Sequence, residues 1–280
     1  MKVAVTGSTG FVGRHVVAEL ARRGCDVTCV LRRTPNPSPT RVATKAVRVD
    51  LAEPSEHVFE AIGSPEVLIH LAWGGLPNYD SLHHFEAELP LHYAWLKSLV
   101  AGGLVHVVST GTCFEYGLQC GALREDMATL PVNAYGLAKD RLRRKLEFLQ
   151  AQTPMMLTWA RLFYMFGDGQ SEQSLLPQLR RAVARGDAKF AMSGGEQLRD
   201  YLPVGDAARH LVDLALAGRG HGVVNVCAGR PISVRALVEA WIEANGWTIG
   251  LDLGRFAYPT HEPMAFWGDD AKLRGCLSPR

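Results

Sequence analysis

The sequence predicts an α/β fold in which a doubly wound parallel sheet carries a smaller, discontinuous C-terminal lobe. Two observations support this prediction. Short apolar runs alternate with helical stretches through the first 165 residues, and this alternation loosens after about residue 166. Strands buried on both faces read as continuous apolar runs, and β-α alternation places helices on both faces of a parallel sheet. A chain of 280 residues can form a large core and a second lobe.

Seven apolar runs predict strands, at 2–7, 26–31, 45–50, 66–72, 104–110, 155–163 and 222–228. Helices are predicted at 11–23, 54–62, 82–101, 134–151 and 174–185. We expect a first domain over 1–165, to which 204–230 contribute, and a second lobe formed mainly by 166–280.

Composition excludes several classes of function. The formal net charge is +2 and long basic runs are absent, so nucleic-acid binding is not expected. The N-terminus has no signal-peptide pattern, and no stretch of 18 apolar residues exists, so we expect no membrane span. The six cysteines form no C-x-x-C pair, which favours a reduced cytoplasmic setting over a disulfide framework or a metal site.

The first predicted strand runs directly into a glycine-rich turn, "TGSTGFVGRHV", at the start of a helix. Glycine permits a tight turn and a close approach of the backbone to a ligand. The free N–H groups at the helix N-terminus can then bind a pyrophosphate. This arrangement predicts a Rossmann-type dinucleotide site, although the spacing is G-x-x-G-x-x-G. Its predicted residues are Gly7, Thr9, Gly10, Phe11, Val12 and Gly13.

The second strand ends in "CVLRRT", with Arg32 and Arg33 where NAD-binding chains carry an acid. Guanidinium groups suit a 2′-phosphate, so NADPH is favoured over NAD, which remains possible. Asp50 ends the third strand and either bonds the adenine amine or serves as a turn residue.

"YGLAK" places Tyr135 and Lys139 four positions apart, on one helix face. A lysine ammonium beside a phenol should lower the pKa of the phenol and make it a usable acid or base. A third partner is expected in "VVSTGTCFEYG", at the C-terminal end of a strand, where Ser109, Thr110 and Thr112 offer hydroxyl groups.

Four ordered motifs together resemble the extended short-chain dehydrogenases/reductases, in their nucleotide-sugar epimerase, dehydratase and reductase branch. These motifs are TGxxGFxG, the HLA at 70–72, the strand end closing in "EYG", and YxxxK. The resemblance implies that Thr112 is the catalytic hydroxyl, Tyr135 the acid/base, and Lys139 the residue that holds the cofactor ribose. It further implies sugar-nucleotide contacts from Gly167, Gln170, Leu176 and Arg199. Cofactor contacts are also expected from Leu51, Leu71, Ala72 and Trp73, and Asn78, in the loop after the fourth predicted strand, could touch the sugar.

The same resemblance implies a homodimer that pairs the helices 82–101 and 134–151. Two loop histidines, His83 and His84, are expected to be solvated, although either could touch the sugar. Asn133 is expected to cap the helix that carries Tyr135.

Departures from the family pattern narrow the reaction. Dehydratases of the family carry an Asp-Glu pair after the catalytic threonine, where this chain has Cys113 and Phe114, so 4,6-dehydration is not expected. Cys113 is interpreted as a small buried hydrophobe. The arginine pair favours exchangeable NADPH and therefore the reduction of a nucleotide-linked 4-keto-6-deoxyhexose. Two alternatives stay open, a 4-epimerase with bound NAD and a non-catalytic NADP-binding sensor protein.

Overall fold

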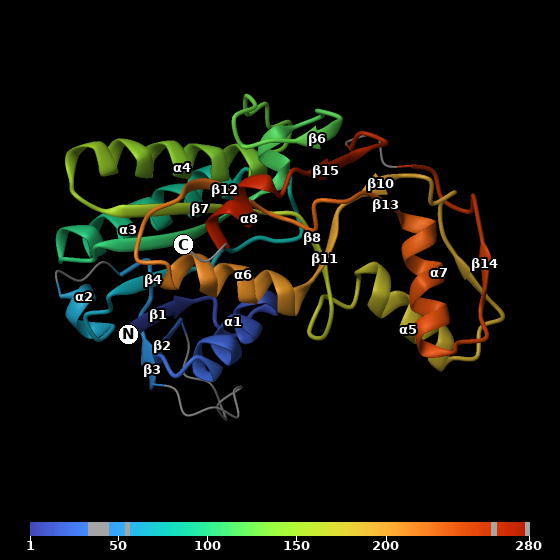
Figure 1. Cartoon of the computed structure of the whole chain (residues 1–280), viewed down its shortest axis with the longest axis horizontal. Coiled ribbons are helices and arrows are strands. Elements are labelled where there is room, and N and C mark those ends of the chain that lie inside the picture. The colour runs from blue at the N-terminus through green and yellow to red at the C-terminus, as the bar shows by residue number, and fades with distance from the viewer. Residues whose placement is uncertain (33–44, 54–56, 259–261, 278–280) are drawn as a thin grey trace.

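The computed structural model describes residues 1–32, 45–53, 57–258 and 262–277. The predicted α/β class is confirmed by a seven-stranded parallel sheet in the order β12-β7-β5-β4-β1-β2-β3 (Figure 1). Its strands are β1 (Lys2–Thr6), β2 (Asp26–Leu31), β3 (Lys45–Arg48), β4 (Val67–His70), β5 (His106–Thr112), β7 (Met156–Leu162) and β12 (Gly222–Val226).

Strand β1 lies between β2 and β4, where the order of the sheet reverses. Thr6 at the end of β1 is in register with Val30 of β2 and with His70 of β4. Ligands of open parallel sheets bind at such a reversal, above the carboxyl ends of the strands. The glycine-rich turn begins at Gly7, directly after Thr6, so it opens into this crevice.

Alternation along β1 divides the core between the two faces of the sheet. Val3 and Val5 pack with helices α1 (Phe11–Arg22) and α6 (Val204–Leu216), whereas Ala4 packs with α3 (Leu89–Ala101) and α4 (Ala134–Gln152). Figure 1 shows these two helical layers on either side of the strands. The short helices α2 (Val58–Ala61) and α8 (Ala271–Leu277) lie at the margins.

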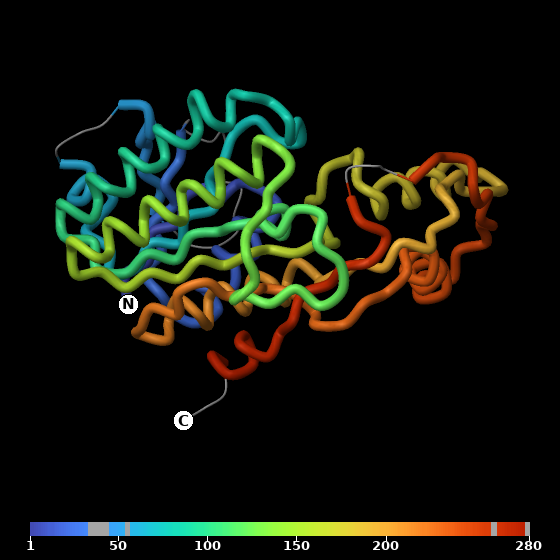
Figure 2. The backbone as a smooth tube through the Cα atoms, turned by 90° about the horizontal axis from the view of Figure 1, so that it is seen from above, coloured from blue at the N-terminus to red at the C-terminus, as the bar shows by residue number. Residues whose placement is uncertain are grey.

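The second lobe has its own apolar cluster and stands apart from the sheet in Figure 1. It contains α5 (Leu175–Ala184), α7 (Val234–Asn245), β9 (Lys189–Ala191) and β14 (Gly250–Asp252). The connecting strands are β8 (Tyr164–Phe166), β10 (Leu198–Arg199), β11 (Tyr201–Pro203) and β13 (Ile232–Ser233). Figure 2 shows the C-terminal segment returning to the sheet domain, where β15 (Phe266–Gly268) pairs with β6 (Gly121–Leu123).

The helix expected over 82–101 is not regular throughout. It begins as a π-helical turn, η1 (His84–Glu88), and continues as α3. Pro90, in the first turn of α3, lacks the N–H that a regular helix would bond to the preceding turn, which accounts for the change. The irregular turn buries both His84 and Glu88. Of the helix expected over 54–62, the structure describes residues 57–62 and places a helix at Val58–Ala61.

The outer face of α4 is polar. Arg141, Arg144 and Lys145 are exposed there, together with Phe148. Pairing of α3 and α4 with a second copy of the chain remains a prediction.

Candidate active site

The glycine-rich turn fits a dinucleotide pyrophosphate. A Cβ atom at Gly13 would lie 2.0 Å from the Gly7 carbonyl oxygen, and one at Gly7 would lie 2.8 Å from the Ala72 nitrogen. Only glycine allows this packing of the turn against the backbone that follows β4. Helix α1 begins after Gly10 with no side-chain cap, so its first N–H groups are available to an anion. Thr9, Phe11 and Val12 are exposed or partly exposed at the same turn.

Of the two arginines predicted to favour NADPH over NAD, the structure describes one. Arg32 is exposed just after β2, and Arg33 lies outside the described residues. An oxygen of Asp50 accepts the Ala52 N–H at 3.0 Å, which is the turn role that the sequence left open. Leu51 packs against the core on the α3–α4 side of the sheet.

The structure brings Thr112, Tyr135 and Lys139 together at the carboxyl end of β5. Thr112 is the last residue of β5, and its side chain lies close enough to the phenol of Tyr135 to lower the pKa of that phenol. Lys139 Nζ donates to the carbonyl oxygen of Thr110 at 2.7 Å. The expected cap of α4 is present, because Asn133 Oδ1 accepts the Gly136 N–H at 2.7 Å.

Burial dominates the electrostatics of the Tyr135–Lys139 pair. It raises the pKa of Tyr135 above its ordinary value, and the neighbouring Thr112 side chain only partly opposes this rise. Burial also lowers the pKa of Lys139 to about 7, although Glu115 and Glu88 oppose that shift. The pKa of Tyr135 therefore moves in the opposite direction from the one predicted from the sequence.

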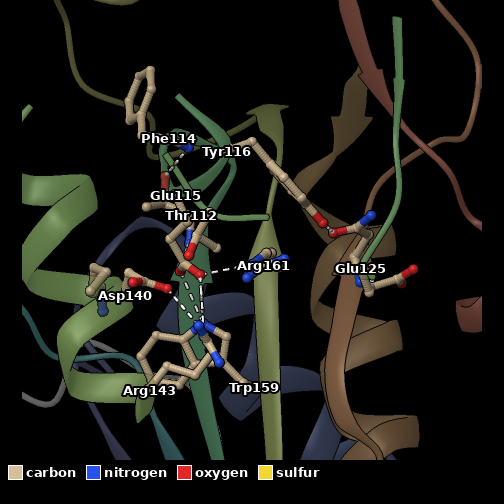
Figure 3. A network of polar contacts seen from close by, with 12 residues as sticks. Thr112, Phe114, Glu115, Tyr116, Glu125, Asp140, Arg143, Trp159 and Arg161 are labelled. Carbon is tan, nitrogen blue, oxygen red and sulfur yellow. Dashed lines mark hydrogen bonds and ion pairs between the residues drawn. The ribbon is translucent and has the colours of Figure 1, made fainter. Parts of the chain in front are cut away.

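A buried carboxylate, Glu115, holds the backbone of Thr112 in place (Figure 3). Its Oε1 accepts the Thr112 N–H and the Trp159 indole N–H, both at 2.9 Å. Its Oε2 accepts Arg161 Nε at 2.7 Å, so the strand end is locked to β7 by an ion pair. Arg143 of α4 lies beside this pair, with its Nε 4.0 Å from Glu115.

Sequence reasoning missed Glu115 and Arg161. The available signals were an acid inside the otherwise uncharged "GTCFEYG" and an arginine inside the apolar run "MMLTWARLF". Each is a charge in a segment predicted to be buried, and buried charges of this kind are paired.

The loop after β4 covers the phenol of Tyr135. Trp73 Nε1 donates to His84 Nδ1 at 3.1 Å, and His84 Nε2 donates to the Asn78 carbonyl oxygen at 2.8 Å. The ring of His84 lies 5.4 Å from that of Tyr135. The expectation of a solvated His84 is wrong, because the π-helical turn buries it. The side chain of Asn78 itself is exposed.

His83 is half-exposed, as expected for a loop, but it is not merely solvated. Its side chain is 48% exposed and its Nε2 lies 3.0 Å from Glu88 Oε1. Cys113 is buried in an apolar cluster, and burial raises the pKa of its thiol, in agreement with its interpretation as a hydrophobe.

Arg199 is buried and already paired. Its Nη2 lies 2.9 Å from Glu262 Oε2, and its guanidinium lies 4.5 Å from the Phe266 ring centroid. Tyr164 donates to the same carboxylate at 2.6 Å. A diphosphate contact by Arg199 remains a prediction, and it would require exchange of Glu262 for the phosphate.

The other predicted substrate contacts lie farther into the second lobe. Leu176 is part of the apolar cluster of that lobe, so its visible role is packing. Gln170 Nε2 donates to the Met165 carbonyl oxygen at 3.0 Å, and Gly167 packs against Val204. The structure does not bring these residues to the catalytic hydroxyls.

Across the described residues, His, Cys, Asp and Glu side chains form no group of three or more that could hold a metal ion. Within the same described ranges, every helix is too short or too polar to cross a bilayer.

Comparison with known proteins agrees with this geometry. Residues 3–227 match the model of the NAD dependent epimerase/dehydratase family. The chain is 28% identical over 270 residues to dTDP-6-deoxy-L-talose 4-dehydrogenase (NAD(+)) of Aggregatibacter actinomycetemcomitans, covering 96% of this chain and 99% of that protein. It is 27% identical to UDP-glucose 4-epimerase of Corynebacterium glutamicum, covering 89% of this chain and 82% of that protein.

A solved structure, described as MoeE5 in complex with UDP-glucuronic acid and NAD, superposes with a TM-score of 0.83 at 27% identity. It covers 99% of this chain and 92% of that one. These findings confirm the resemblance inferred from the four motifs. The chain belongs to the NAD dependent epimerase/dehydratase family, in the extended short-chain dehydrogenase/reductase class, and is an NAD(P)-dependent enzyme of that class.

Proposed function

We propose that the protein is an NADPH-dependent reductase of a nucleotide-linked 4-keto-6-deoxyhexose, in deoxysugar biosynthesis. The observation that carries the proposal is the convergence of Thr112, Tyr135 and Lys139 at the carboxyl end of β5, beside the glycine-rich turn. The residues after Thr112 are Cys113 and Phe114, so no acid pair for dehydration is present there. The likeness to a 4-dehydrogenase of a deoxysugar nucleotide over nearly the full chain supports the sugar class, although the cofactor in the name of that relative is NAD(+).

The side chains suit the reductive direction. NADPH bound at the glycine-rich turn would supply the hydride that C4 of the ketone requires. Tyr135 is protonated at neutral pH, as an ordinary phenol is, so it can donate its proton to O4 and complete the alcohol. Burial raises its pKa further, so the proton passes only once negative charge makes O4 strongly basic. The Thr112 hydroxyl can donate a hydrogen bond to O4 while negative charge develops there. Lys139, whose pKa burial lowers to about 7, can hold the ribose and return a proton to Tyr135.

The preference for NADPH is supported by Arg32, which is exposed after β2 with no acid at the strand end. Arg32→Ala should therefore reduce the ratio of kcat/KM for NADPH to that for NADH by about tenfold, since a guanidinium–phosphate contact is charge-assisted. An unchanged ratio would remove Arg32 from the cofactor site.

The direct test is spectroscopic. Absorbance at 340 nm is followed with NADPH or NADH and a panel of dTDP-, GDP-, CDP- and UDP-4-keto-6-deoxyhexoses. Oxidation of NADPH with one member of the panel is the expected result, and it identifies the nucleotide. Failure to oxidise either cofactor with any member would overturn the proposal.

A 4-epimerase with bound NAD is the second candidate, supported by the similarity to UDP-glucose 4-epimerase of Corynebacterium glutamicum. It predicts that purified protein retains NAD and interconverts 4-epimers with no net change at 340 nm. The retained tyrosine and lysine argue against a third candidate, a non-catalytic NADP sensor. We further propose a cytoplasmic homodimer.

A further inference from the structure

Four side chains form a continuous hydrogen-bonded chain behind the catalytic pair. Thr6 Oγ1 lies 2.9 Å from His70 Nδ1, and His70 Nε2 lies 2.8 Å from His92 Nδ1. His92 Nε2 in turn lies 3.0 Å from Glu88 Oε2. All four residues are buried, and they come from β1, β4, α3 and the π-helical turn η1.

The direction of every hydrogen bond among these four side chains can be assigned. The Thr6 oxygen accepts two backbone N–H groups, so its hydroxyl proton must go to His70 Nδ1. His70 then carries its proton on Nε2 and donates to His92, which donates from its own Nε2 to Glu88. Both histidines are neutral, because burial lowers the pKa of each. Because each hydrogen bond among these side chains has one assigned donor and one assigned acceptor, none of the side chains can rotate without losing a buried hydrogen bond.

Both ends of the chain hold the same short piece of backbone. At one end, the N–H groups of Leu71 and Ala72 donate to Thr6 Oγ1 at 3.1 and 3.2 Å. At the other end, the Gly74 N–H donates to Glu88 Oε2 at 2.6 Å. A Cβ atom at Gly74 would lie 2.5 Å from Glu88 Oε1, so a larger residue there would displace the carboxylate.

Trp73 is the side chain between these two attachments. Its ring stacks on His92, with centroids 4.8 Å apart and an interplanar angle of 13°. Lys139 Nζ lies 4.3 Å from the Trp73 ring centroid, and the ring of Tyr135 is 6.1 Å away. The indole therefore touches both the supporting chain and the catalytic pair.

We propose that Thr6, His70, His92 and Glu88 are positioning residues, which hold residues 71–74 so that Trp73 forms one wall of the cofactor site beside Lys139. This inference rests on one part of the proposed function, the binding of a dinucleotide next to Lys139. It does not depend on which sugar is reduced.

The test is a double-mutant cycle read by NADPH affinity, measured as fluorescence enhancement of the dinucleotide. Glu88→Gln alone should weaken binding about tenfold, because a charge-assisted hydrogen bond is lost. In the Trp73→Phe background the same substitution should change the affinity by about twofold or less, since coupled residues are not additive. Glu86→Gln, an exposed acid on the same turn η1, is the matched control and should leave the affinity unchanged.

A second pair of variants tests Thr6, at the other end of the hydrogen-bonded side chains. These variants keep the inference testable if Glu88→Gln does not fold. Thr6→Ser retains the hydroxyl and should keep the wild-type NADPH affinity, whereas Thr6→Val should weaken it. Equal loss in both Trp73 backgrounds, or equal affinity of the two Thr6 variants, would overturn the inference. The readout is binding, so a failure to reduce any sugar would count against the proposed function and not against this inference.

Discussion

Two buried carboxylates act on Lys139, and their surroundings differ. Glu115 is paired with Arg161 and the Trp159 indole, groups that do not change charge near neutral pH. Glu88 is bonded by His92, whose pKa burial lowers, and by the half-exposed His83. The same residue type therefore forms an ion pair with a buried arginine on one side of the site and hydrogen bonds with imidazole rings on the other.

The site therefore contains two separate carboxylate networks, one at Thr112 and one at the loop that carries Trp73. The Glu115 network fixes the backbone of Thr112. The Glu88 network orients the loop that carries Trp73 through neutral histidines. Substitutions on the two sides should therefore have effects of different size.

The largest effect on stability is expected from Glu115→Gln. Removing the carboxylate leaves the Arg161 guanidinium buried without a counter-charge, which should lower the free energy of unfolding by about 3–5 kcal/mol. Urea denaturation at pH 7 measures this. Glu147→Gln is the control, because Glu147 is 43% exposed in its pair with Arg143 and should cost about 0.2–1 kcal/mol. Equal losses in the two variants would show that the buried ion pair contributes no more to the free energy of unfolding than the exposed one.

Lys139→Met should abolish turnover and change how stability depends on pH. The pKa of Lys139 is lowered to about 7 in the folded protein from an ordinary 10.5. The unfolded chain therefore binds more protons between these values, and wild-type stability rises with pH across this window. From pH 6 to pH 9 the wild type should gain about 2–3 kcal/mol relative to Lys139→Met. Parallel pH profiles from denaturation would contradict a depressed lysine pKa.

Glu88→Gln should destabilise less than Glu115→Gln, by about 1–2 kcal/mol at pH 7, because it leaves neutral histidines and no buried cation. Burial would raise the pKa of Glu88, but hydrogen bonds from His92 and Gly74 outweigh it and lower the pKa to about 2. The contribution of the Glu88 carboxylate is therefore complete above pH 4.5 and is lost as the pH falls towards 2. Denaturation of both variants at pH 7 checks the ranking, and a larger loss in Glu88→Gln would reverse the comparison.

The parts of the site that depend on local pattern were predictable from the sequence. The glycines of the first turn follow a strand and open a helix, and the spacing of Tyr135 and Lys139 places them on one helix face. The carboxyl end of β5 carries Thr112 to the same edge of the sheet. Each of these depends on the order and period of elements, which the sequence displays directly.

The two carboxylate networks were not predictable, because their partners come together only through tertiary register. Glu115 and Arg161 are 46 positions apart and meet because β5 and β7 are adjacent strands. His70 and His92 are 22 positions apart, on β4 and α3, and Glu88 reaches His92 from an irregular π-helical turn that the sequence pattern did not predict. The prediction that the pKa of Tyr135 is lowered was wrong for the same reason. Burial raises this pKa, and burial depends on packing and not on the spacing of a lysine.

The proposed role of Tyr135 is to donate a proton to a sugar ketone above the carboxyl end of β5. It is tested most directly by comparing Tyr135→Phe with the wild type in NADPH oxidation with the sugar nucleotide that the panel identifies, alongside NADPH affinity. We expect a loss of turnover of about 10²–10⁴-fold, with NADPH affinity close to that of the wild type. Turnover equal to that of the wild type would contradict it.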